Sequence, residues 1–152
     1  MGSRETRVLR LAGIGAAVLL AVAAGFQSAL ALGLPLGAAT LGGRATTVDG
    51  VLTPPFRGAA AATALVLVLF AWLFLVRAQV LPRRVIGPRA ARLCTGAVLF
   101  LMVVNTAGNF SAPHPLERWG MGAVTSLVVL LGGFVALRAP ADQPGASATD
   151  VR

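Results

Sequence analysis

The chain has 152 residues, of which 57% are hydrophobic before its 18 glycines are counted and only 12% are charged, whereas an ordinary soluble domain has about 25% charged residues. A chain this short has too little interior to hide so much apolar surface from water, which argues against a soluble enzyme, a disordered chain and a disulfide scaffold and predicts an integral membrane protein. Its net charge of +8 comes from arginines in short polar gaps between apolar runs, not along a face with stacking aromatic residues, so we expect no nucleic-acid partner.

The first apolar run covers residues 11–34 and is interrupted only by Gln27 and Ser28. As a helix of about 36 Å it would cross a hydrocarbon core of about 30 Å with some tilt. The preceding arginines and the small residues Ala29 and Ala31 also fit a cleaved signal peptide. Because the apolar character continues past these alanines, the sequence favours an uncleaved span.

A long loop follows, from about Pro35 to Arg57. The pair Asp49-Gly50 lies in the middle of residues 45–53, and Asp-Gly is typical of a type I′ turn, so we expect a short hairpin there. Long ordered loops usually cap or bind something.

Three further runs follow the loop. Residues 58–76 and 119–137 each have the length of a membrane span. The third run is apolar only over residues 93–104, and it reaches a normal length when it is extended to residue 110 through Asn105 and Asn109. We therefore predict a third span over residues 93–110, with a re-entrant segment as the alternative.

The arginines predict the orientation, since basic residues collect in cytoplasmic loops. Three arginines, Arg44, Arg57 and Arg118, lie on one side. Nine lie on the other side: Arg4, Arg7, Arg10, Arg77, Arg83, Arg84, Arg89, Arg92 and Arg138. The sequence thus predicts an all-α transmembrane four-helix bundle over residues 1–138, with both termini in the cytoplasm, a long extracytoplasmic loop between helices 1 and 2, and a disordered tail over residues 139–152.

The arginines of the second loop are also candidates for binding anionic lipid headgroups. These candidates are Arg83, Arg84, Arg89 and Arg92. A role in topology alone is the favoured alternative. The single cysteine, Cys94, lies in an apolar run, where we expect a small buried side chain.

Polar residues collect near the outer ends of the first and third spans. Asn105 and Asn109 are four residues apart and share one helix face, and polar groups at membrane depth should face the bundle and find partners. We therefore expect an outer polar cluster of Gln27, Arg44, Asn105, Asn109, His114, Glu117 and Arg118. The cluster either ties helix ends together, which we favour, or binds a small molecule or lipid. One histidine without a second histidine or cysteine predicts no metal site, and we expect no cofactor.

Spaced small and polar residues run through the chain, namely Gly33-x-Pro35-x-Gly37, Gly42-Gly43, Gly50 to Leu52, Pro54, Asn105-x-x-x-Asn109-x-Ser111 and Glu117-Arg118. With this set, residues 33–137 resemble an uncharacterised family of small four-span integral membrane proteins of bacteria. The resemblance implies a multi-pass protein of the bacterial inner (plasma) membrane and directs attention to the outer loops. It implies no activity and no catalytic residue.

Three functions are compatible with these features. The favoured one is an accessory, structural or partner-binding membrane protein, whose partners are membrane lipids, a second copy or another membrane protein. The first alternative is a small-molecule or lipid binding or transport protein that uses the outer polar cluster, whose residues would then line a cavity. The second alternative is a membrane enzyme for a lipid-soluble substrate, with Glu117 or His114 as proton carrier.

Overall fold

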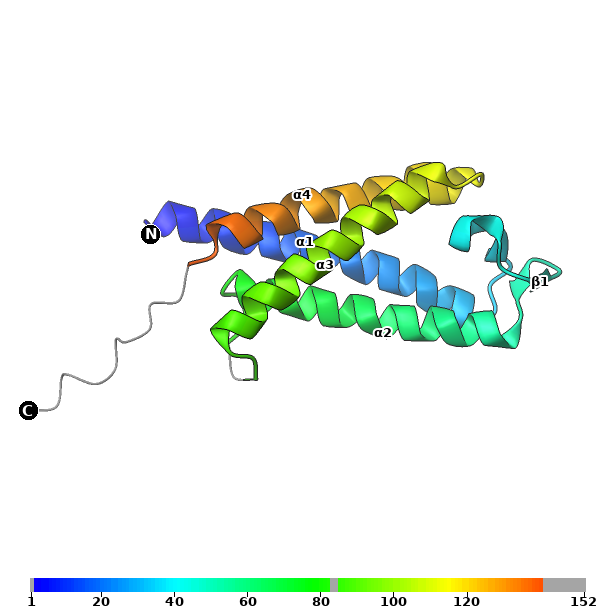
Figure 1. Ribbon diagram of the computed structural model, residues 1–152, viewed down its shortest axis with the longest axis horizontal. Coiled ribbons are helices and arrows are strands. Elements are labelled where there is room, and N and C mark those ends of the chain that lie inside the picture. The colour runs from blue at the N-terminus through cyan, green and yellow to red at the C-terminus, as the bar shows by residue number, and fades with distance from the viewer. Residues whose placement is uncertain (1, 83–84, 141–152) are drawn as a thin grey trace, which may run out of the picture.

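The structure is a computed structural model that describes residues 2–82 and 85–140. This part of the chain contains four long helices, α1 (Ser3–Leu32), α2 (Pro54–Arg77), α3 (Pro88–Ser111) and α4 (Gly122–Arg138) (Figure 1). A π-helical turn, Leu116–Met121, leads directly into α4. By length and composition, all four helices could cross a membrane, the last counted from Leu116. The predicted all-α fold with four apolar helices is confirmed.

Prolines begin two of these helices earlier than the apolar runs suggest. Pro54 and Pro88 lie in the first turns of α2 and α3, where a fixed φ and a missing N–H are favourable. The extension back to Pro88 makes α3 a continuous helix of 24 residues. Its length therefore no longer favours a re-entrant segment. The candidates Arg83 and Arg84, and residues 141–152 of the predicted tail, lie outside the described residues.

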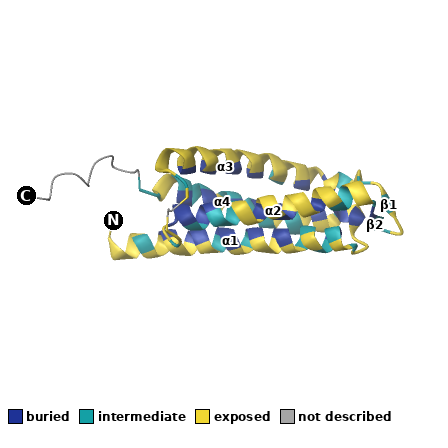
Figure 2. Ribbon diagram, turned by 90° about the horizontal axis from the view of Figure 1, so that it is seen from below, coloured by how far each residue is buried: buried dark blue, intermediate teal, exposed yellow. Residues whose placement is uncertain are grey.

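Helix α1 is the centre of the arrangement, because it packs along both α2 and α4. Helix α3 packs on α4 and makes little contact with α2 (Figure 1). Most of the surface of α3 is exposed (Figure 2), and Cys94 on this helix is exposed rather than buried as expected. The four helices therefore form a bundle that is open between α2 and α3.

Small residues allow close packing in the half of the bundle that holds the first residues of α1 and the last residues of α4, which we call the termini end (Figure 1). Gly13 of α1 lies against Ala78, and Gly132 of α4 lies against the fully buried ring of Phe74. A Cβ at position 132 would be 2.5 Å from Cζ of Phe74. Gly25 of α1, by contrast, is exposed, and a Cβ there would meet nothing within 4 Å.

The opposite half, the hairpin end, is covered by the connection between α1 and α2. It contains two 3-10 turns, Gly37–Ala39 and Leu41–Gly43, and an antiparallel hairpin of β1 (Thr47–Val48) and β2 (Val51–Leu52). Asp49 and Gly50 have φ values of 51° and 80°, as a type I′ turn requires. The predicted hairpin is therefore confirmed, and the buried side chain of Leu52 packs with Leu30 and Ala60.

The π-helical turn was not predicted. Pro115 precedes the turn as its N-cap residue and already has helical backbone angles, with a φ of −58° and a ψ of −38°. The N–H of Leu116 donates to Nδ1 of His114 over 3.2 Å, so this histidine caps the turn. π-Helical turns are rare and change which side chains share a helix face.

Candidate functional site

A cavity of about 650 Å³ lies at the hairpin end of the bundle. All four helices contribute to its walls, and the 3-10 turn at Leu41–Gly43 borders it. The walls are mainly apolar, with side chains that include Leu20, Phe26, Phe56, Leu67, Phe70, Met102 and Val128. Apolar walls with a few polar groups are typical of small-molecule sites, which range from about 300 to 1,000 Å³.

Polar side chains from every part of the bundle interrupt the apolar walls. They are Gln27, Thr40, Arg44, Thr63, Asn105, Asn109, Ser111, Glu117 and Thr125. Five of the predicted cluster residues are in this set, which brings together the first helix, the long loop, the third helix and the start of the fourth.

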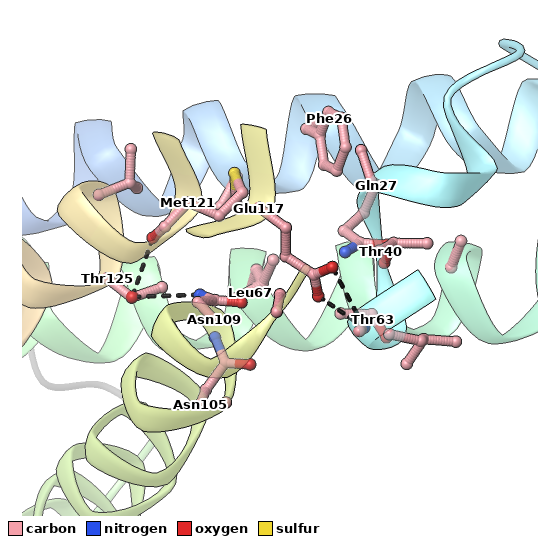
Figure 3. A pocket seen from close by; sticks show the side chains of 18 of the residues that line it. Phe26, Gln27, Thr40, Thr63, Leu67, Asn105, Asn109, Glu117, Met121 and Thr125 are labelled. Carbon is pink, nitrogen blue, oxygen red and sulfur yellow. Dashed lines mark hydrogen bonds between the residues drawn. The ribbon is translucent and has the colours of Figure 1, made fainter. Parts of the chain in front are cut away.

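Glu117 is the most deeply placed charged residue of the cavity, with 6% of its surface exposed. The backbone N–H of Gly42 donates to both of its carboxylate oxygens, over 2.9 Å to Oε1 and 3.1 Å to Oε2. Figure 3 shows this carboxylate extending from the π-helical turn toward Gln27 and Thr40. The two hydrogen bonds fasten the long loop to the start of the fourth helix.

The two asparagines of α3 have different surroundings, although they share one face of the helix. Asn109 is buried, and its Nδ2 donates to Oγ1 of Thr125 over 3.2 Å (Figure 3). Thr125 in turn donates to the carbonyl of Met121 over 2.9 Å. Asn109 therefore ties α3 to α4, whereas the side chain of Asn105 is exposed and borders the cavity.

Two predicted cluster residues do not line the cavity. His114 accepts the hydrogen bond of the Leu116 N–H, and Arg118 is half-buried, with a buried Nε that has no hydrogen-bond partner among the described residues. The other two charged candidates do line the cavity, Glu117 at its buried side and Arg44 with an exposed side chain. The predicted cluster is thus split between a cavity and its surroundings.

The cavity also contains residues that sequence analysis did not select. Thr63 is the only polar side chain between residues 58 and 76, and this isolation in an apolar run was a usable signal. Thr40 and the backbone N–H of Gly42 had no comparable signal, because both lie in a loop whose position depends on the fold. Gly42 has a φ of 64°, which places its N–H in reach of Glu117.

The described arginines at the termini end do not line this cavity. Arg89 and Arg92, two of the predicted headgroup ligands, are exposed in the first turns of α3. Arg77 at the end of α2 is buried, with 3% of its surface exposed, which its position in a predicted polar loop did not suggest. Within residues 2–82 and 85–140, no group of three or more His, Cys, Asp or Glu side chains could hold a metal ion.

The comparisons with known proteins give no relative for this chain. No family model matches it, and no curated protein and no solved structure matches it either. The four apolar helices are consistent with a small four-helix membrane protein.

Proposed function

We propose that the protein binds an amphipathic, lipid-soluble molecule in the cavity at the hairpin end of its bundle. The observation that carries this proposal is the meeting of five predicted polar residues in one cavity of about 650 Å³ with mainly apolar walls. If the cluster served only to tie helix ends together, each of its polar side chains would be hydrogen-bonded to a neighbouring helix or loop. Among the described residues of the cluster, Asn109 bonds to Thr125 and Glu117 bonds to the loop, whereas Gln27, Arg44 and Asn105 have no side-chain hydrogen bond.

The open side of the cavity supports entry from the lipid. Thr63 and Val66 on α2 and Leu101 and Asn105 on α3 line the cavity and are also exposed. These two helices make little contact with each other, and their exposed faces are apolar. A lipid-soluble molecule would therefore pass between α2 and α3 and place its polar end beside the buried polar groups.

An accessory role for part of the cluster has its own support. The bond from Asn109 to Thr125 joins α3 to α4, and bonds of this kind between membrane helices serve packing. A catalytic role has less support, because Glu117 is the one carboxylate, histidine or cysteine side chain among the described residues that line the cavity. No second general acid or base accompanies it there.

We also propose that the hairpin end faces outward from the plasma membrane of a bacterium and that both termini are cytoplasmic. The uneven distribution of arginine supports this orientation, and the family resemblance supports the bacterial membrane. The test uses a Cys94→Ser background with one new cysteine, Asp49→Cys in the hairpin or Pro82→Cys after α2. A maleimide that cannot cross the membrane should label only the first in intact cells, and labelling of only the second would reverse the orientation.

The cavity itself offers a test of binding with a matched pair of variants. Gly108 lines the cavity and Gly96 does not, both belong to α3, and a Cβ added at either meets nothing within 4 Å. Gly108→Phe should therefore fill the cavity, whereas Gly96→Phe adds the same side chain to the lipid-facing surface. Each protein is reconstituted in vesicles of phosphatidylethanolamine and phosphatidylglycerol with diazirine-bearing acyl chains, and irradiated.

In the wild-type protein and in Gly96→Phe, we expect cross-links at cavity residues such as Leu67 and Met102. Because the phenylalanine ring would occupy space that the bound molecule needs, the yield at these residues should fall about tenfold in Gly108→Phe, the change produced by a loss of about 1.4 kcal/mol in binding. Equal yields in the two variants would contradict the proposed function.

A further inference from the structure

We propose that the polar head of the bound molecule is zwitterionic, with an ammonium group held by Glu117 and an anionic group held by Arg44. This inference rests on the proposed function and names the class of ligand. Both residues line the same cavity, and they form no ion pair with each other. The arrangement thus presents one negative and one positive charge, held apart, to a single occupant.

The surroundings of Glu117 favour a cationic group. The side chain is 94% buried, by its exposed fraction of 6%, and its partner is the neutral N–H of Gly42. Within residues 2–82 and 85–140 it has no ion-pair partner. A buried carboxylate is costly without a cation, and a carboxylate can accept about four hydrogen bonds. Gly42 contributes one N–H, so acceptor capacity remains for an ammonium group.

Aromatic side chains add to this preference. The rings of Phe26 and Phe56 line the cavity with Glu117, and the face of an aromatic ring attracts a cation. Gln27, whose side chain lies near Glu117 in Figure 3, offers a neutral amide that can hydrogen-bond to either end of a polar head.

Arg44 supplies the opposite charge at the exposed edge of the cavity. It follows Gly42 by two residues, so the same 3-10 turn that holds Glu117 also positions this arginine. Its side chain is exposed and has no hydrogen bond or ion pair among the described residues. A guanidinium group binds phosphate through paired N–H bonds, which makes a phosphate the best-matched anionic group.

The two charges together select among amphiphiles. A purely anionic head would be repelled by Glu117, a purely cationic head would be repelled by Arg44, and an uncharged head would leave the buried carboxylate without a cation. An aminophospholipid such as phosphatidylethanolamine carries an ammonium group and a phosphate separated by two carbons. It can therefore satisfy Glu117 and Arg44 at once, with its acyl chains between α2 and α3.

The test measures dissociation constants by native mass spectrometry of the protein in a neutral maltoside detergent. The probes are phosphatidylethanolamine, phosphatidylglycerol and diacylglycerol with identical acyl chains, and a long-chain amine. A charge-assisted hydrogen bond contributes about 1.5–3 kcal/mol, so phosphatidylethanolamine should bind about tenfold more tightly than each of the others.

Two substitutions test which residue binds the ammonium group and which binds the phosphate. Each is paired with a control that removes a charge of the same sign from a residue outside the cavity. Glu117→Gln keeps one carbonyl oxygen for the Gly42 N–H and should weaken phosphatidylethanolamine binding about tenfold, whereas Asp49→Asn in the exposed hairpin turn should leave it unchanged. Arg44→Gln, at an exposed position, should weaken the binding of phosphatidylethanolamine and of phosphatidylglycerol by the same factor. Arg118→Gln removes an arginine that does not line the cavity. It should leave the binding of both phospholipids unchanged.

The outcomes separate this inference from the proposed function. Equal binding of all four probes by the wild-type protein, lost in Gly108→Phe, would overturn the zwitterionic head and leave the cavity as a binding site. Tightest binding of phosphatidylglycerol or of the amine would also overturn it. If no probe bound the wild-type protein better than Gly108→Phe, the proposed function itself would fail.

Discussion

The two ends of the bundle use the same kinds of residue in opposite ways. At the termini end, Gly132 leaves the space that the ring of Phe74 fills. At the hairpin end, Gly108 on α3 faces open space and borders a cavity of about 650 Å³. A glycine in a membrane helix therefore has no single meaning, because its role depends on what the neighbouring helix places opposite.

At the hairpin end, specific hydrogen bonds join the long loop, α3 and the start of the fourth helix beside the cavity. Gly42 holds Glu117, and Asn109 holds Thr125. These bonds connect the loop, α3 and α4, while α2 and α3 make little contact. The contrast suggests that the termini end supplies stability and that the hairpin end supplies the site.

The largest effect is expected where the packing is closest. Gly132→Val would place side-chain carbons against Phe74 and Leu99, and overpacking of this kind costs about 1–3 kcal/mol. Gly133→Val is the matched control, because a Cβ at this position meets nothing within 4 Å. Reversible unfolding in mixed micelles should show a loss of stability only for the first variant. Equal stability of the two would mean that the termini end is not closely packed.

A smaller effect is expected at the loop that borders the cavity. Gly42 has a φ of 64°, and a side chain in this left-handed region costs about 1 kcal/mol. Gly42→Ala should therefore lower the free energy of unfolding by about that amount, whereas Gly58→Ala, within α2 and in open space, should raise it by about 0.4–1 kcal/mol. The same unfolding measurement reports both, and a shift of the same sign in both variants would argue against the strained loop.

The smallest effect concerns the bond between α3 and α4. In a double-mutant cycle of Asn109→Leu and Thr125→Val, the coupling energy should be about 0.6 kcal/mol, the average for such bonds between membrane helices. The cycle isolates this pair from the loss of the Thr125 bond to Met121. A coupling energy of zero would show that the hairpin end is not held together at this bond.

Much of the fold could be predicted from the sequence, because hydropathy locates membrane helices and Asp49-Gly50 specifies its turn. The grouping of Asn105, Asn109 and Glu117 could also be predicted, since polar residues are rare at membrane depth and face the bundle. The rest could not. The π-helical turn changes the faces of the residues that follow it, so Glu117 reaches the cavity while Arg118 does not. The residue types also do not indicate that the backbone N–H of Gly42 donates to Glu117.

The most direct test of binding in the cavity measures how many lipid molecules stay with the purified protein. Three forms are purified from the same membranes, namely the wild-type protein, Gly96→Phe and Gly108→Phe, and native mass spectrometry counts the lipids bound to each. We predict that the wild-type protein and Gly96→Phe each retain about one lipid molecule that washing with detergent does not remove, as expected for a protein with one binding site. Gly108→Phe, which fills the cavity, should lose this molecule. Retention of the same amount by all three forms would contradict the claim that the cavity is a binding site.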